Sequence, residues 1–272
     1  NAFKITFGDG ILACMSRDFG IFMPKHLAVQ WLLNKLLHYI SIIGPMDQLL
    51  IQTKRKGVKI DMAIFEGAGV ALVTPMNENL EVNYDKLEEL LEEQIAGGTD
   101  AIVICGTTGE SATLTEEEHM RTIKFAIDKV NHRIPVVAGT GSNSTATATQ
   151  MSKEAAEAGA DGILLVTPYY NKGTQNGLIK HYTTITEEAK VPAILYNVPS
   201  RTGCSLAAST VAYLAKNAEY VTAIKEASGD ISHVADIMYA CDGAIDLYSG
   251  MMTRSYRSCL WAEKVLSLYC PM

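Results

Sequence analysis

The stretch GILLVTPYYN, residues 162–171, decides the fold of this chain. It begins with a run of small and aliphatic residues without a polar interruption, and it continues into a turn that contains Thr167 and Pro168. A strand that is apolar on both faces is typical of a parallel sheet covered by helices on both sides. A helix-length segment of mixed polar and apolar residues follows. The stretch therefore begins a strand-turn-helix unit.

The same unit repeats from residue 62 onward. We predict strands at Gly69–Val73, Ala101–Cys105, Pro135–Ala138, Gly162–Val166, Pro192–Tyr196, Val221–Lys225 and Ile245–Tyr248. Predicted helices include Tyr84–Ala96, Glu116–Val130, Thr145–Ala158 and Ala207–Lys216. Thr115 and Glu118 have the spacing of a capping box. No GxGxxG or GK[ST] motif follows the first strand, so units of this length and number favour an α/β fold of the (β/α)8 TIM-barrel type over a Rossmann sheet.

Composition narrows the class of function. The 272 residues are 48% hydrophobic and carry a formal net charge of -7, without a basic stripe, which argues against a nucleic-acid partner. The six cysteines lack CxxC spacing and clustered histidines, which predicts no metal site, no disulfide framework and a cytoplasmic location. The apolar stretch 27–43 is interrupted by polar residues and falls short of the ~20 apolar residues of a membrane span.

Lys225 is the strongest candidate for a catalytic residue. It ends the run Val221–Lys225, and period-2 alternation places it on the same face as Ala223. Desolvation lowers the pKa of an amine from about 10.4, which leaves the free amine that a Schiff base requires. The alternative is a strand-end lysine that reaches solvent. Polar residues at the carboxyl ends of the other predicted strands, where barrels carry their chemistry, favour catalysis.

Three further motifs follow predicted strands. GTTGES, residues 106–111, is a tight turn whose N–H groups and hydroxyls suit a carboxylate, although a glycine-rich turn with a helix N-cap is the alternative. TPYYN, residues 167–171, places two tyrosines at the rim. YNVPSRTG, residues 196–203, adds Tyr196, which can relay protons, and Arg201, which can bind a carboxylate unless it only faces solvent.

In this order, these motifs and IKEA at 224–227 resemble the 4-hydroxy-tetrahydrodipicolinate synthase (dihydrodipicolinate synthase) family, from about Met62 to Gly250. The resemblance implies a class I aldolase-type lyase of the diaminopimelate route to lysine. Such an enzyme condenses pyruvate with L-aspartate-4-semialdehyde through a lysine Schiff base, with no cofactor. The resemblance also implies a homotetramer that is a dimer of dimers.

The resemblance implies a role for each motif residue. Lys225 would form the Schiff base, and Tyr196 would move protons as the imine becomes an enamine. The other implied assignments are Thr107 and Tyr170 for the proton relay, Thr108 for the pyruvate carboxylate, Arg201 for the semialdehyde carboxylate, and backbone groups of Ala223 and Gly250 for the pocket. Tyr170 would act in the site of the neighbouring subunit.

A feedback site for lysine is also implied, at Ser111, Ala112, Glu116, His119, Asn143, Thr147 and Tyr169. Many inhibited relatives carry a histidine where Glu116 stands and a glutamate where Thr147 stands. Without that glutamate the ammonium of the inhibitor is poorly paired, so we expect weak or no inhibition by lysine.

N-acetylneuraminate lyases and keto-deoxy-sugar aldolases are the alternative families, because they share the lysine and the tyrosine. Thr107 and Arg201 favour the synthase over these two families.

The two ends depart from the resemblance. Residues 1–61 show no strand-helix rhythm, and the basic run 54–59 suggests translated upstream sequence, with a helical extension as the alternative. After Gly250, a one-base shift of the reading frame would produce the observed residues from the family's sequence. We therefore expect an incomplete barrel over 62–250, an atypical tail over 251–272 and an open barrel edge. The alternative hypothesis, which is not an enzyme function, is that the chain is an inactive fragment.

Overall fold

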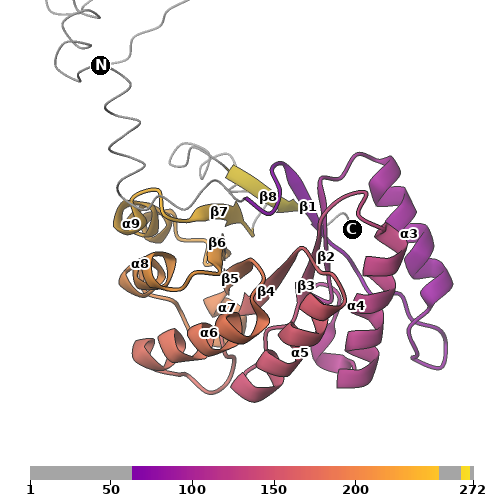
Figure 1. Ribbon diagram of the computed structural model, residues 1–272, viewed down its shortest axis with the longest axis horizontal. Helices are drawn as coiled ribbons and strands as arrows, with labels where there is room; N and C mark the ends of the chain where they lie inside the picture. The colour runs from indigo at the N-terminus through magenta and orange to yellow at the C-terminus, as the bar shows by residue number, and fades with distance from the viewer. Residues whose placement is uncertain (1–62, 251–264, 270–272) are drawn as a thin grey trace, which may run out of the picture. The chain divides into compact units, whose positions relative to one another are not determined.

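The computed structural model describes residues 63–250 and 265–269 (Figure 1). Eight parallel strands form a closed barrel in chain order, which confirms the predicted fold class. The strands are β1 (Ala68–Ala71), β2 (Ala101–Ile104), β3 (Val136–Gly139), β4 (Gly162–Val166), β5 (Ala193–Asn197), β6 (Val221–Glu226), β7 (Asp246–Ser249) and β8 (Val265–Tyr269). The seven predicted strands agree with the first seven of these to within two residues at each end.

Helices cover the outer face of the barrel (Figure 1). They are α3 (Tyr84–Ala96), α4 (Glu116–Val130), α5 (Thr145–Glu157), α6 (Gln175–Ala189), α7 (Pro199–Thr202), α8 (Ala208–Asn217) and α9 (Ile231–Cys241), with the 3-10 helix η1 (Ser111–Thr113). The capping box at α4 is present, since Thr115 and Glu118 exchange hydrogen bonds between side chain and backbone N–H. None of the described helices has the length and apolar character of a transmembrane span.

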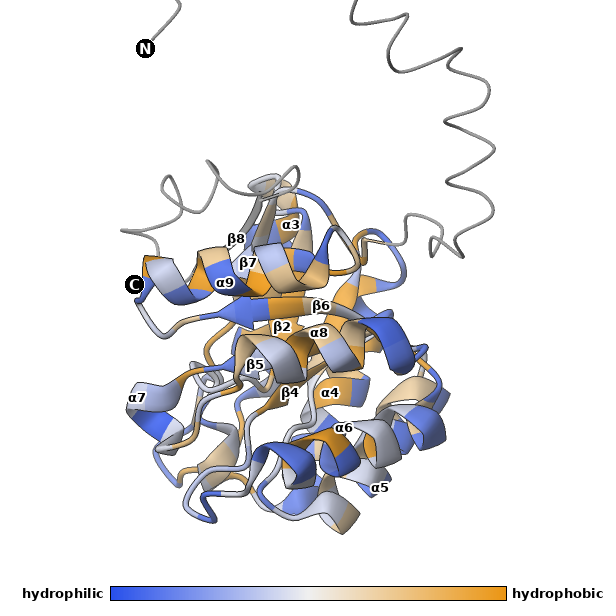
Figure 2. Cartoon of the chain, turned by 90° about the vertical axis from the view of Figure 1, so that its left-hand side faces the viewer, coloured by the Kyte–Doolittle hydropathy of each residue, from blue (hydrophilic) through white to orange (hydrophobic). Residues whose placement is uncertain are grey.

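The hydrophobic colour is prominent in the central strands, for example at β2 and β6 (Figure 2). Successive strand residues belong to two different apolar layers. The barrel interior includes Ile194, Tyr196, Ala223 and Ala227. The layer between the strands and the helices includes Leu195 and Ile224. This alternation places Lys225 on the inner face and its neighbour Glu226 on the outer face.

The prediction of an open barrel without an eighth strand is wrong. Val265–Tyr269 runs parallel to β7, where Leu247 pairs with Val265, and to β1, where Gly69 pairs with Leu268. The sequence signal was the run VLSLY, which is rich in strand-forming residues. Closing a barrel edge requires backbone hydrogen bonds to both neighbours, and five residues suffice for this. Residues 265–269 therefore contribute a strand, and the expectation of an open strand edge is corrected. The division of the chain into a barrel over 62–250 and an atypical tail over 251–272 stays a prediction.

The remaining predictions about the ends concern residues 1–62, 251–264 and 270–272, which lie outside the described part of the chain. The extension over 1–61 and the shifted reading frame after Gly250 stay predictions. The expected low activity rested on an open edge, and β8 removes that physical reason.

Candidate active site

Lys225 and Tyr196 lie side by side at the carboxyl ends of β6 and β5. Their Cα atoms are register partners, and Lys225 Nζ lies 4.5 Å from the centroid of the Tyr196 ring. Both residues are buried, with 7% and 6% exposed surface. Lys225 is therefore an interior lysine resting on an aromatic face, and the alternative of a solvent-reaching strand end is wrong.

Small residues surround the Lys225 side chain. Ala223 and Ala227 are buried on the same inner face of β6. A side-chain carbon at position 250 would lie 3.2 Å from Lys225 Cε and only 2.6 Å from Ala227 Cβ. The Gly250 N–H also donates to the Glu226 carbonyl over 2.8 Å. Position 250 therefore requires glycine, and the predicted role of Ala223 and Gly250 in the pocket stays a prediction.

Thr107 and Arg201 both act on the Tyr196 phenol. Burial is the largest effect, and it raises the pKa of Tyr196 above its usual value. A hydrogen bond with the Thr107 side chain and the charge of Arg201 lower the same pKa. The phenol therefore carries its proton at neutral pH, and two groups stabilise the phenolate when the proton leaves. A group that donates a proton and later takes it back, as in general acid-base catalysis, requires this behaviour.

A small cavity of about 20 Å³ adjoins the phenol. Its walls are Cys105, Gly106, Thr107, Ser111, Gly139, Gly141, Leu164, Val166 and Tyr196. Gly139 and Gly141 allow the strands to approach closely here, because a side-chain carbon at either position would lie within 2.4 Å of a neighbouring backbone atom. A larger hollow of about 320 Å³ lies on the outer surface, between α4 and α5. Of these two cavities, only the small one is lined by Tyr196.

The GTTGES turn lies at the carboxyl end of β2. Thr107 is exposed and Thr108 is half-buried, so both hydroxyls lie near the surface of the site. The Thr74 hydroxyl donates to the Gly109 carbonyl over 2.7 Å and holds the turn against the end of β1. Glu110 precedes η1 and makes no side-chain cap. The turn therefore provides no side-chain cap for η1, and its role in binding a carboxylate stays a prediction.

Tyr170 and Arg201 occupy neighbouring loops at the rim. The Tyr170 N–H donates to the Thr202 carbonyl over 3.3 Å, which joins the loop after β4 to α7. Arg201 is exposed, yet its charge reaches Tyr196. The Tyr170 side chain is 89% exposed. Its predicted role in a neighbouring subunit stays a prediction.

The residues of the predicted lysine site lie on the loops after β2, β3 and β4 and at the starts of α4 and α5. Asn171 Nδ2 donates to the Asn143 carbonyl over 2.8 Å and joins two of these loops, next to Tyr169. His119 is buried, its Nε2 lies 2.7 Å from the Gly139 carbonyl, and burial lowers its pKa. Ser111 also lines the cavity beside Tyr196. The remaining members are Ala112 and Glu116, which are exposed, and Thr147, which is half-buried.

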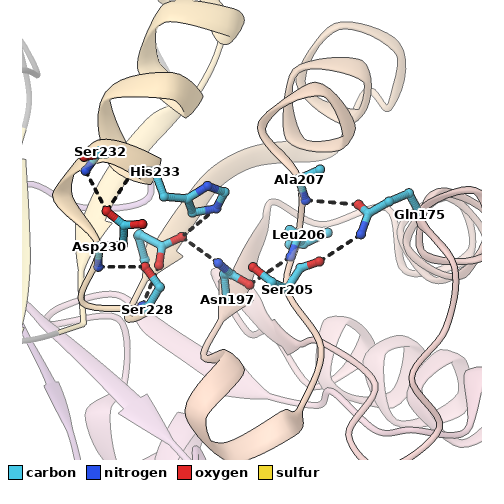
Figure 3. Close-up of polar contacts among 10 residues, drawn as sticks. Gln175, Asn197, Ser205, Leu206, Ala207, Ser228, Asp230, Ser232 and His233 are labelled. Carbon is cyan, nitrogen blue, oxygen red and sulfur yellow. Dashed lines mark hydrogen bonds and ion pairs between the residues drawn. The ribbon is translucent and has the colours of Figure 1, made fainter.

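Sequence reasoning missed Glu226, which is buried directly after Lys225. Asn197 Nδ2 donates to Glu226 Oε2 over 2.8 Å (Figure 3). The sequence motifs contain both residues but predict no role for either of them. The available signal was a carboxylate two residues after the apolar, outward-facing Ile224 on the same strand.

The fold and the site together define a (β/α)8-barrel protein with a buried lysine against a tyrosine at the carboxyl ends of its sixth and fifth strands. Residues 64–260 match the model of the dihydrodipicolinate synthetase family. The chain belongs to this family.

Individual relatives agree with this assignment. A 4-hydroxy-tetrahydrodipicolinate synthase from Lachnoclostridium phytofermentans is 59% identical over 189 residues, which cover 70% of this chain and 64% of that protein. A dihydrodipicolinate synthase crystal structure from Aquifex aeolicus has a TM-score of 0.73 at 41% identity, covering 76% of this chain and 70% of that one. The crystal structure of the chloride-inhibited dihydrodipicolinate synthase from Acinetobacter baumannii, complexed with pyruvate, has a TM-score of 0.72 at 44% identity. The match covers 75% of this chain and 70% of that one. The chain thus spans 64% of the length of the first relative.

Proposed function

We propose that this chain condenses pyruvate with L-aspartate-4-semialdehyde through a Schiff base on Lys225. The observation that carries the proposal is the buried Lys225 Nζ, 4.5 Å from the centre of the Tyr196 ring. The free amine of a lysine is the nucleophile that forms such a Schiff base. The similarity to a synthase complexed with pyruvate supports the choice of first substrate.

The proposed chemistry divides the work between two residues. Lys225 Nζ attacks the keto carbon of pyruvate, and water leaves as the imine forms. Loss of a methyl proton then gives the enamine, whose carbon attacks the aldehyde of the second substrate. Tyr196 donates and takes back protons, and its hydrogen bond with Thr107 supports this role. The imine itself draws electrons from the methyl carbon, so the proposal needs no cofactor.

The rim residues carry the substrate specificity in this proposal. Thr108 binds the pyruvate carboxylate, and Arg201 binds the carboxylate of the semialdehyde. Tyr170 completes the relay from the neighbouring subunit of a homotetramer, and its 89% exposed surface in one chain supports that role. We also assign the reaction to the cytoplasm, which the spacing of the cysteines in the sequence predicts.

Borohydride reduction in the presence of pyruvate tests the proposal. We expect a covalent adduct on Lys225, located by peptide mass spectrometry. Lys225→Arg should abolish the adduct, because a guanidinium stays protonated and cannot form the imine. Lys153→Arg, on the exposed face of α5, is the matched control. This variant should form the adduct on Lys225 to the same extent as the parent chain. An adduct on a different lysine would refute the mechanism, and strong cleavage of N-acetylneuraminate would favour the related lyases.

The proposal extends to regulation by lysine. Glu116 is exposed at the start of α4, and Thr147 in α5 offers a hydroxyl instead of the carboxylate that would pair with an ammonium. Lysine should therefore inhibit the chain weakly or not at all, which a titration of activity against lysine measures. Strong inhibition would show that another acidic residue binds the ammonium.

A further inference from the structure

The outer face of β5 and β6 carries a buried amide-carboxylate pair, Asn197 and Glu226, here called the outer pair. Asn197 is fully buried and Glu226 is 5% exposed. Asn197 Nδ2 donates to Glu226 Oε2 over 2.8 Å, and the Ser228 N–H donates to Glu226 Oε1 over 2.6 Å (Figure 3). His233 Nε2 lies 3.8 Å from the same Oε2 atom. Both carboxylate oxygens are therefore held by the surrounding structure.

The outer pair is one residue along each strand from Tyr196 and Lys225, here called the inner pair. The register pairs Tyr196 with Lys225 and Asn197 with Glu226. Successive side chains of a strand point to opposite faces, so one pair faces the barrel interior and the other faces the helices. A change in the spacing or twist of the two strands at the outer pair would therefore displace the inner pair.

Asn197 also links the two strands to the segment that follows Arg201. Its Oδ1 accepts the Leu206 N–H over 3.0 Å. Gln175, at the start of α6, holds both sides of Leu206, because its Oε1 accepts the Ala207 N–H and its Nε2 donates to the Ser205 carbonyl (Figure 3). The network thus runs from α6, through Asn197 and Glu226, to the loop before α9.

In the outer pair, Asn197 can only donate to Glu226, and Glu226 can only accept. Asn197 must use its NH₂ group toward Glu226, because its oxygen is occupied by the Leu206 N–H. Glu226 must accept on both oxygens, because it faces the Asn197 amide and the Ser228 N–H. A buried donor that faces another donor, or two carboxylates that face each other, would force the strand ends apart.

We propose that Asn197 and Glu226 are positioning residues that hold Tyr196 and Lys225 at their reactive separation. This inference rests on the proposed function and deepens it, because it assigns a role in imine formation to a pair that lies outside the substrate pocket. Neither residue touches the reacting atoms. Their contribution is the fixed geometry of two adjacent strand ends, which is the kind of preorganisation that catalysis at a covalent amine requires.

A reciprocal exchange tests the proposal. Asn197→Asp alone places two carboxylates face to face, and Glu226→Gln alone places an amide NH₂ against a donor. The double variant restores every hydrogen bond, because Gln at 226 donates to Asp at 197, which still accepts the Leu206 N–H. Each single variant should lower kcat and the rate of pyruvate trapping on Lys225 by about 10- to 100-fold, with the pyruvate KM within about threefold. The double variant should recover most of the loss.

The control pair has the same chemistry on the surface. Gln150 Nε2 donates to Glu154 Oε1 over 2.8 Å on the exposed side of α5, so Glu154→Gln should leave trapping unchanged. Thermal melting of every variant separates loss of fold from loss of geometry. Single variants that trap pyruvate at the parent rate would overturn the proposal, as would a folded double variant that is as slow as the singles. Absence of any adduct in the parent would instead overturn the proposed function, and this inference with it.

Discussion

Tyr196 and Lys225 are register partners on adjacent strands, and the nitrogen of the lysine lies 4.5 Å from the centre of the tyrosine ring. The ring therefore contacts the amine through its face, while its hydroxyl interacts with Thr107 and with the charge of Arg201. One aromatic side chain thus joins Lys225 to the polar rim. The contact through the ring and the proposed proton transfer through the hydroxyl are separable by mutation.

Tyr196→Phe should keep the ring over Lys225 and remove the proton donor. We expect kcat to fall by about 10²-fold, with a nearly unchanged pyruvate KM, because general acid-base catalysis contributes at this level. Steady-state kinetics measures the change. Tyr182→Phe is the control, since the buried Tyr182 hydroxyl has no hydrogen-bond partner among the described residues and its loss should not change kcat. Equal effects of the two substitutions would contradict the assignment.

Arg201→Ala should weaken use of the semialdehyde more than binding of pyruvate. Truncating one partner of a buried charge pair costs about 2–5 kcal/mol. Because Arg201 is exposed, we expect the lower value, a loss of about 2 kcal/mol in kcat/KM for the semialdehyde. The loss of its charge should also raise the pKa of Tyr196 further. Arg121→Ala, which removes a cation that lies over Tyr84 on the outer helices, serves as the control. Equal losses for both substrates would refute the role of Arg201.

Gly250→Ala should disturb the lysine directly. The added carbon would lie 2.6 Å from Ala227 Cβ and 3.2 Å from Lys225 Cε, so β6 and β7 must shift to accept it. We expect a destabilisation of about 1–3 kcal/mol, together with slower pyruvate trapping. Urea unfolding and borohydride trapping report the two effects. Gly173→Ala, whose added carbon would meet only Leu178 Cδ2 at 3.8 Å, should change neither.

Buried His181 should make stability depend on pH. Its Nδ1 lies 2.8 Å from Thr145 Oγ1, and burial lowers the pKa of His181 to about 4, against about 6.5 in the unfolded chain. As the pH falls from about 6.5 to 4, the unfolded chain binds a proton that the folded chain does not. The free energy of unfolding should therefore decrease by on the order of 1 kcal/mol per pH unit in that window, and the contribution is fully present above it.

Urea unfolding between pH 7 and 4 measures this dependence, with His181→Gln as the reference. The difference between the two chains should shrink as the pH falls, because the variant lacks the group that titrates. A difference that stays constant across the window would show that His181 is protonated in the folded state as readily as in the unfolded one.

Patterns along the chain predicted the strands because each predicted strand is a local run. Tyr84–Ala96 and Glu116–Val130 were also predicted at their observed ends, since Asn83 and Thr115 provide local caps. Helix α6 was not singled out, because Gly177 and several threonines weaken its propensity, although Leu178, Tyr182 and Ile185 bury one face. Its formation depends on tertiary packing.

The eighth strand shows the limit of local reasoning. Val265–Tyr269 follows a segment without the strand-helix rhythm, so the run was not identified as a strand. Its place is determined by two partners that are distant in sequence, β7 and β1, which both have unpaired edges until it lies between them.

The sequence by itself determined the candidate site residues, since Lys225 at the end of an apolar run, Tyr196 and the GTTGES turn are all local signals. Only the tertiary structure decided how they meet. The 4.5 Å approach of Lys225 to Tyr196 depends on the register of β5 and β6, and the burial of Glu226 against Asn197 depends on the same register. Register is a property of two paired strands, so neither strand's own residues specify it alone.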